Sequence, residues 1–170
     1  MRGLALSGGG IKAAAHIGAL KAFEEKNIKF DCVSGASSGS IIATMYALGY
    51  SSDEMWKMFK RYCKNKICRV KPSIPISTAV RASCSFPVVF SPCRYNGIQL
   101  IDGGTRENLP WKELKEIGAD EVFGISFNTI FKEKDCCKNI IDVAARAMEL
   151  QDRKLTMYEK TGIDNLITIN

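Results

Sequence analysis

Two glycine-rich turns near the start of the sequence constrain its fold more than any other feature. Each turn follows a short apolar run of strand type and precedes a stretch with helical spacing of apolar residues. The turns are residues 8–10 and 35–39, the apolar runs are 4–6 and 30–33, and the helical stretches are 13–26 and 40–48. Repeated passage from a buried strand to a helix indicates an α/β fold with a mainly parallel central sheet.

The rest of the sequence continues this alternation. We expect helices at 53–62, 77–84, 110–118 and 139–154, strands at 121–127 and 166–169, and a hairpin that turns at Asn96-Gly97 and ends in a strand at 98–101. A length of 170 residues suits one hydrophobic core, so we expect a single domain over 1–170. No apolar run approaches the roughly 20 residues of a membrane span.

The second turn, Gly35-Ala36-Ser37-Ser38-Gly39, has the form G-x-S-x-G. Small residues on both sides of a serine let the backbone bend sharply enough to expose the hydroxyl at a strand-to-helix corner. Because Gly and Ser are frequent in ordinary turns, the pattern gains its meaning from the strand before it and the helix after it. Ser37 is therefore the candidate nucleophile.

The first turn, Gly8-Gly9-Gly10, permits close approach of the backbone to a bound group. Its N–H groups at a helix N-terminus could stabilise an oxyanion. Glycine-rich loops at helix starts also bind nucleotides. Neither G-x-x-x-x-G-K-[ST] nor G-x-G-x-x-G matches 8–18, because Lys12 follows the glycines by two positions and no Ser or Thr comes next.

A serine nucleophile needs a base, and the sequence has one histidine, His16. His16 precedes Ser37, whereas in α/β-hydrolases the histidine follows both nucleophile and acid, so we interpret His16 as a structural residue. The best alternative base is Asp102, because the Gly103-Gly104 pair after it lets the chain turn away from a carboxylate that points into a cleft. Taken alone, Asp102-Gly103 would be interpreted as a simple turn, because Asp-Gly is a common turn dipeptide.

Several of these motifs together resemble the patatin-like phospholipases, which are lipid acyl hydrolases. The motifs are, in chain order, 6–12, 15–20 and 35–39, then Arg81-Ala82-Ser83 followed by Phe86-Pro87, and Asp102-Gly103-Gly104. Their common order makes the resemblance far more specific than any one motif, and it extends in blocks from Gly3 to about Gly124.

The resemblance implies a compact three-layer α/β fold with a Ser-Asp dyad, which maps onto Ser37 and Asp102. It also implies an oxyanion hole at Gly8, Gly9 and Gly10, with Lys12 as the basic residue that follows. The expected activity is hydrolysis of carboxylic esters of phospholipids or related lipids, with no metal or organic cofactor. Two alternatives stay open: a non-catalytic lipid-binding module, and a general esterase or thioesterase with the same dyad.

The resemblance leads us to expect a longer stretch between the helix after the serine turn and Arg81-Ala82-Ser83 than the segment 51–77 found here. Either this is a compact member with a trimmed sheet, or the chain is incomplete. The segment is also basic, with seven Lys and Arg residues and no acidic residue between Lys57 and Lys71. Met55, Trp56 and Phe59 lie close by, a composition suited to peripheral contact of 55–71 with an anionic membrane. The alternative is a solvated helix face whose apolar side packs on the core.

Charge and cysteine content narrow the classes of partner, cellular compartment and metal site that fit this sequence. A net charge of +6 would suit nucleic acid, but no reading motif accompanies it, so we expect no nucleic-acid partner. Seven cysteines, an odd number, and a sequence that begins directly with a strand indicate a reducing compartment without a secretory signal, and we expect a cytoplasmic protein. No C-x-x-C pair is present, which disfavours a metal site.

Overall fold

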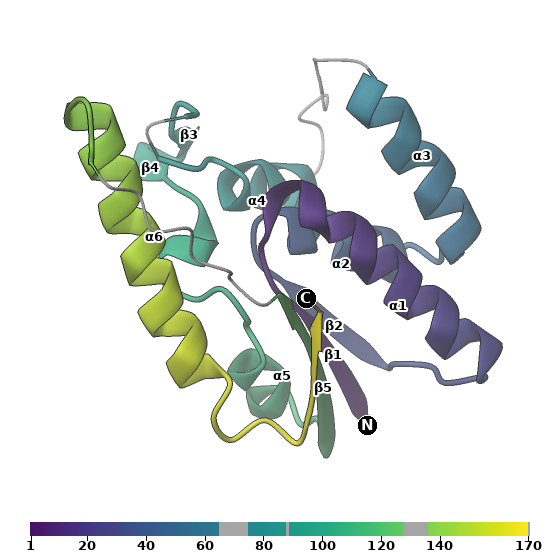
Figure 1. Cartoon of the computed structure of the whole chain (residues 1–170). Coiled ribbons are helices and arrows are strands. Elements are labelled where there is room, and N and C mark those ends of the chain that lie inside the picture. The colour runs from purple at the N-terminus through teal and green to yellow at the C-terminus, as the bar shows by residue number, and fades with distance from the viewer. Residues whose placement is uncertain (65–74, 88, 128–135, 170) are drawn as a thin grey trace.

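The computed structural model describes residues 1–64, 75–87, 89–127 and 136–169, and its centre is a parallel β-sheet (Figure 1). The sheet has the strand order β2-β1-β5-β6. These strands are β1 (Arg2–Leu6), β2 (Cys32–Gly35), β5 (Glu121–Phe127) and β6 (Asn165–Ile169). A separate antiparallel hairpin pairs β3 (Cys93–Tyr95) with β4 (Ile98–Leu100). The expected α/β fold with a parallel sheet is confirmed.

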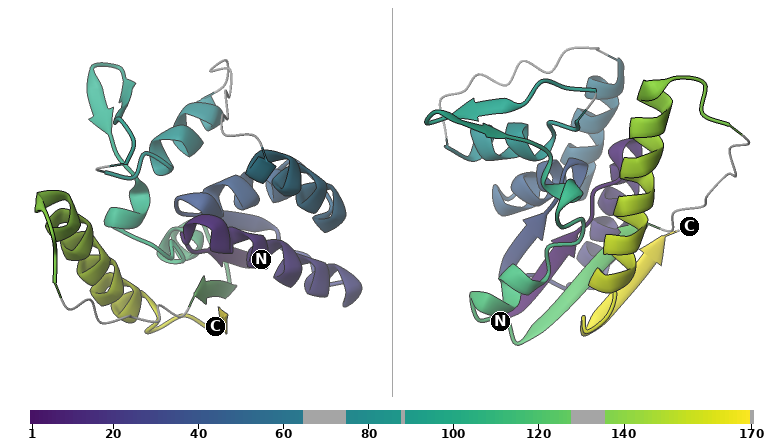
Figure 2. Two further views of the ribbon diagram at one scale, coloured as in Figure 1. Left: turned by 45° about the horizontal axis from the view of Figure 1, so that its top comes forward. Right: turned by 90° about the vertical axis from the view of Figure 1, so that its left-hand side faces the viewer.

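Helices cover both faces of this sheet. They are α1 (Ala14–Glu25), α2 (Ser38–Ala47), α3 (Ser52–Lys64), α4 (Pro75–Ser83), α5 (Lys112–Glu116) and α6 (Ile140–Glu159), with short 3-10 turns η1 (Gly10–Ala13) and η2 (Gly103–Thr105). In Figure 1, α1, α2 and α3 lie on one side of the sheet and α5 and α6 on the other. The molecule therefore has the expected three layers, and the two views of Figure 2 show the same arrangement.

Alternation along β1 builds a core on each face of the sheet. Leu4 and Leu6 are fully buried in a cluster with side chains of α1, α2 and α3, whereas Ala5 between them faces a second cluster that includes Leu114 of α5. Successive side chains of a strand point to opposite faces, so residues 4–6 of β1, which are buried between the two layers, are all apolar. This continuous apolar run is the signal that predicted the strand.

The position of β1 in the sheet brings the two glycine-rich turns together. Leu6 is in register with Gly35 of β2 on one side and with Ile125 of β5 on the other. The chain goes from β1 to β2 and later returns to the opposite side of β1, so the strand order reverses there. Ligands of open α/β sheets bind at such a point, beyond the carboxyl ends of the strands.

The element bounds agree with the sequence-based expectations to within a few residues. Asn96 and Gly97 have φ of 47° and 78°, the left-handed values that a type I′ hairpin turn requires. The helix expected at 110–118 is shorter, since α5 spans five residues. Among the described residues, no helix is both long and apolar enough to cross a bilayer.

Candidate active site

The backbone at the Ser37 corner, between β2 and α2, has a strained conformation that tight packing around it maintains. Ser37 has φ 46° and ψ −124°, outside the regions that non-glycine residues usually occupy. A Cβ on Gly35 would lie 2.6 Å from the carbonyl carbon of Gly39, and a Cβ on Gly39 would lie 2.4 Å from Leu6 O. The two glycines of G-x-S-x-G are therefore required because α2 begins directly against β1 and β2.

This steric requirement predicts opposite effects for the same substitution at two glycines. Gly39→Ala should lower the free energy of unfolding by about 3 kcal/mol or prevent folding, because the new methyl group meets backbone that cannot move aside. Gly18→Ala, in α1, should raise it by up to about 1 kcal/mol, because no atom lies within 4 Å of the position that its methyl group would take. Urea unfolding of both variants tests this. A Gly39→Ala protein as stable as the wild type would contradict the packing described.

The segment that begins with Arg81-Ala82-Ser83 connects the serine corner to Asp102. Ser83 Oγ accepts a hydrogen bond from Ser37 N at 2.9 Å, and Ser85 O accepts one from Asp102 N at 3.0 Å. Cys84 Sγ donates to Ser37 O at 3.3 Å. From the sequence, this segment could be recognised only as part of the family pattern, and no role could be assigned to it. The structure shows that it fixes the backbone at Ser37 and at Asp102.

Asp102 lies just after the β3–β4 hairpin, at the start of η2, and is 1% exposed. Its Oδ1 accepts a hydrogen bond from Gly104 N at 2.8 Å, whereas Oδ2 is buried and has no hydrogen-bond partner among the described residues. Burial raises the pKa of this carboxyl above its usual value, and the Ser37 hydroxyl and Gly104 N lower it less. The Ser37 hydroxyl is thus near enough to affect Asp102, although the two groups do not meet standard hydrogen-bond geometry.

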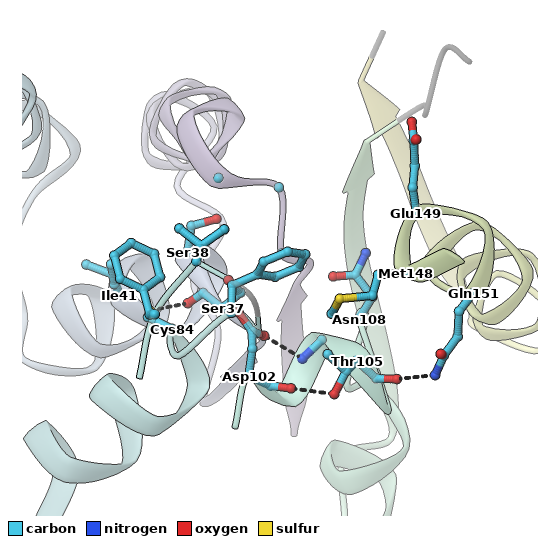
Figure 3. A pocket seen from close by; sticks show the side chains of 17 residues that line it. Ser37, Ser38, Ile41, Cys84, Asp102, Thr105, Asn108, Met148, Glu149 and Gln151 are labelled. Carbon is cyan, nitrogen blue, oxygen red and sulfur yellow. Dashed lines mark hydrogen bonds between the residues drawn. The ribbon is translucent and has the colours of Figure 1, made fainter. Parts of the chain in front are cut away.

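Ser37 and Asp102 both open into one cavity of about 560 Å³ at the carboxyl ends of the strands (Figure 3). Polar groups and glycines form one part of its lining, and apolar side chains form the rest. The apolar lining residues are Ile41, Phe86, Val89, Phe90 and Met148. A cavity with a few polar groups and mainly apolar walls is typical of a binding site for an apolar ligand.

The glycine turn borders the same cavity, but its three residues differ in their surroundings. Gly8 N donates a hydrogen bond to Asn108 O at 3.2 Å, so this donor has a partner. A Cβ on Gly9 would lie 2.5 Å from the Phe127 ring, whereas the corresponding position on Gly10 has no neighbour within 4 Å. Lys12 is exposed beside the turn and is not among the residues that line the cavity. The predicted oxyanion hole stays a prediction.

His16 is fully buried beneath the glycine turn and is not among the residues that line the cavity. Its Nε2 lies 2.8 Å from Ser7 O, which requires the proton on Nε2, and its ring packs on Phe127 with centroids 4.7 Å apart. Burial lowers the pKa of His16, so the ring is neutral near pH 7. These contacts support the structural interpretation of this histidine.

A second cavity, of about 380 Å³, is lined by Gly35 and Ala36 and by the carboxyl-bearing residues Glu107 and Glu113. Burial, a hydrogen bond with Glu113 and the charges of Glu113 and Glu159 raise the pKa of Glu107 to about 7. Two nearby carboxyl groups cannot both ionise at low cost.

This raised pKa predicts a stability that depends on pH. The folded protein binds the Glu107 proton more tightly than the unfolded chain, so the free energy of unfolding should fall as pH rises from 4.5 to about 7. Solvent screening limits the loss to roughly 1 kcal/mol. Glu107→Gln should remove this part of the decline, as measured by urea unfolding at pH 5 and pH 8. Equal declines in the variant and the wild type would contradict the assignment.

Within the described part of the chain, no group of three or more His, Cys, Asp or Glu side chains is placed to hold a metal ion. This finding does not test whether a metal takes part in the reaction, so the expectation that none does stays a prediction.

The structure is thus a parallel α/β sheet with a glycine turn and a serine corner at the carboxyl ends of its strands, and the corner has the strand-turn-helix form of the G-x-S-x-G elbow. The profile of the family described as "Patatin-like phospholipase" matches residues 4–73 and 67–115. The chain belongs to this family. The resemblance to this family that the sequence predicts is confirmed, whereas hydrolysis of carboxylic esters by this chain stays a prediction.

Among curated proteins, the chain is similar to fungal proteins named lysophospholipase NTE1. It is 29% identical over 181 residues to that of Yarrowia lipolytica, covering 75% of this chain and 13% of the relative. The proteins of Meyerozyma guilliermondii and Eremothecium gossypii are 25% and 28% identical, with 13% and 12% of their length covered. The relatives are thus far longer, and this chain corresponds to a small part of each.

Proposed function

We propose that this chain is a serine lipid acyl hydrolase that cleaves carboxylic esters of phospholipids or related lipids with Ser37 and Asp102. One observation carries the proposal: Ser37 and Asp102 line the same cavity. The backbone of Ser37 is strained, and the buried carboxyl of Asp102 has one oxygen without a hydrogen-bond partner among the described residues. Strained backbone and unpartnered buried polar atoms are costly, and they concentrate at functional sites. Membership of the patatin-like phospholipase family supports the same reaction.

In the proposed reaction, Asp102 Oδ2 accepts the proton of the Ser37 hydroxyl while Oγ attacks the ester carbonyl. Asp102 then gives the proton to the leaving alcohol, and water releases the fatty acid from Ser37. A small movement of the Ser37 side chain would complete the hydrogen bond to Oδ2, since such bonds often tighten only when substrate is bound. No cofactor is needed in this scheme, because the chain itself supplies the nucleophile and the base.

The oxyanion of the tetrahedral intermediate would be held by N–H groups of the glycine turn. We assign Gly9 and Gly10 as the donors, because both border the cavity and Gly8 N already donates to Asn108 O. Gly8 keeps the turn close to the nucleophile, since a Cβ there would lie 3.1 Å from Ser37 Cβ. Lys12, exposed beside the turn, would favour negative charge near it.

The acyl chain of the substrate would occupy the apolar part of the cavity. Ile41 and Phe86 are each 40% exposed and Phe90 is 61% exposed, so these walls are open to a ligand. Burying such side chains against an acyl chain contributes roughly 25 cal/mol per Å² of apolar area. The relatives' name, lysophospholipase, makes a lysophospholipid the first substrate to test.

Peripheral contact with an anionic membrane through 55–71 also remains a proposal. Residues 65–71 lie outside the described residues. In α3, Met55 is fully buried in the core, whereas Trp56 is 43% exposed, stacks on Phe59 and has Lys60 Nζ 5.5 Å from its ring. The apolar side of α3 therefore packs mainly on the core, and Trp56 with its neighbouring lysines is the part available to a bilayer surface.

Hydrolysis measured across short-chain esters, lysophospholipids and phospholipids tests the proposed function. We expect turnover of lysophospholipids, with fatty acid as product. A fluorophosphonate probe separates this function from a non-catalytic lipid-binding module, because covalent labelling requires an activated serine. Lipid binding without labelling or turnover would favour the binding module, and turnover of short-chain esters alone would favour a general esterase.

A further inference from the structure

We infer that Glu159, at the end of α6, is a positioning residue for the reaction at Ser37, acting through Asn108 on the glycine turn. The inference rests on the proposed function. Glu159 lies beyond the residues that match the family profile, which end at 115, and no sequence motif marks it.

Glu159 holds the chain that follows Asp102 through three contacts. Its Oε1 accepts a hydrogen bond from Asn108 N at 2.8 Å, and its Oε2 accepts one from Leu109 N at 2.9 Å. Its backbone carbonyl accepts a third from Trp111 Nε1 at 2.7 Å. Glu159 is 7% exposed and Leu109 is fully buried, so water cannot readily replace these bonds. Burial raises the pKa of the Glu159 carboxyl, and the hydrogen bonds from Asn108 N and Leu109 N lower it less. The two bonds, one to each carboxyl oxygen, fix the position of the loop.

Asn108 contacts the glycine turn directly and so fixes the position of the turn. Its carbonyl accepts the hydrogen bond from Gly8 N, and its Oδ1 would lie 2.6 Å from a Cβ on Gly8, which shows how closely the two residues pack. Asn108 Nδ2 in turn donates to Thr156 Oγ1 of α6 at 3.3 Å. Asn108 lines the cavity together with Thr105 and Met148, and all three are drawn in Figure 3.

These contacts form one path from α6 to the reacting groups. α6 holds Asn108, Asn108 holds Gly8, and Gly8 packs against Ser37. A shift of Asn108 would therefore move the proposed oxyanion donors relative to the serine oxygen. Misplacement of catalytic groups by about 1 Å costs roughly 100-fold in rate. The role of Glu159 is to keep that distance fixed.

The test is the turnover number of Glu159→Gln, counted per active site by fluorophosphonate titration and measured below the unfolding temperature of every variant. The amide NH₂ of glutamine cannot accept the second N–H, so we expect kcat to fall about 10- to 100-fold with KM changed by less than about 2-fold. A residue with only a structural role would lower the number of active sites and leave kcat per site unchanged. That result would overturn the inference.

Asn139→Ala provides a matched control. Asn139 Oδ1 caps the start of α6 by accepting a hydrogen bond from Asp142 N at 2.8 Å, far from Glu159 along the helix. The variant should be less stable than the wild type but keep its kcat per active site. If Glu159→Gln does not fold, Thr156→Val decides instead, because it removes only the acceptor of Asn108 Nδ2. A fall in kcat of about 5-fold supports the inference, and an unchanged kcat overturns it.

Hydrogen exchange at the Gly8 amide separates this inference from the proposed function. Glu159→Gln, or Thr156→Val in its place, should speed Gly8 exchange about 10-fold while the amides of β1 keep the wild-type rate. Unchanged Gly8 exchange would overturn the role of Glu159 even in an active enzyme. A wild-type protein without turnover would contradict the proposed function, and Gly8 exchange would still decide whether Glu159 positions the turn.

Discussion

Replacing Ser37 by alanine is expected to lower kcat/KM for ester hydrolysis by at least about 1,000-fold and to leave the fold intact. The hydroxyl is the proposed nucleophile, and without it no acyl-enzyme forms. The backbone of the corner does not depend on the hydroxyl, because Ser37 N bonds to Ser83 Oγ and the flanking glycines set the bend. Hydrolysis of a lysophospholipid by purified protein measures the effect.

Ser51→Ala is a suitable control, because this exposed hydroxyl bonds to Glu54 at the start of α3 and is not among the groups that line the cavity. It should keep wild-type turnover. If Ser37→Ala keeps more than about a tenth of the wild-type turnover in a preparation free of other esterases, Ser37 is not the nucleophile.

Asp102→Asn is expected to lower kcat by about 1,000- to 10,000-fold. Asparagine keeps an oxygen that can accept the hydrogen bond from Gly104 N, so the local backbone should persist while the proton acceptor is lost. Steady-state kinetics with the same substrate measures the loss. The comparison variant is His16→Gln, whose amide can still donate to Ser7 O. A large loss in His16→Gln together with an active Asp102→Asn would revive a histidine mechanism.

The pH dependence of turnover follows from the same carboxyl group. Asp102 accepts a proton only when ionised, and burial raises its pKa above the ordinary 3.8. Turnover should therefore decline as pH falls through a value higher than 3.8, and the same decline should remain in His16→Gln. An acid limb that disappears in His16→Gln would assign it to the histidine instead.

The fold could be predicted from the sequence because its signals are local. Apolar runs such as Leu4-Ala5-Leu6 are buried on both faces of the sheet, so every residue of the run must be small or apolar. The serine corner was predictable for a steric reason, since only glycine can occupy positions 35 and 39 with α2 so close to β1. Asn96-Gly97 likewise has the positive φ values that these residues adopt most easily.

The supports of the site could not be predicted, because they join residues far apart in the sequence through hydrogen bonds that leave no repeating pattern. Ser83 Oγ reaches Ser37 N across 46 positions, and Glu159 reaches Asn108 N across 51. The hydrogen bond from Gly8 N to Asn108 O could not be predicted either, so the sequence offered all three glycines equally as oxyanion donors. Only the packing of α6 and the loop after Asp102 distinguishes them.

Peptide mapping by mass spectrometry after fluorophosphonate labelling tests most directly whether an aspartate activates the serine without an imidazole. We predict one adduct, on Ser37, in the wild type and in His16→Gln, and little or no adduct in Asp102→Asn over the same time. An adduct on another residue, or equally fast labelling of Ser37 in Asp102→Asn, would contradict this mechanism.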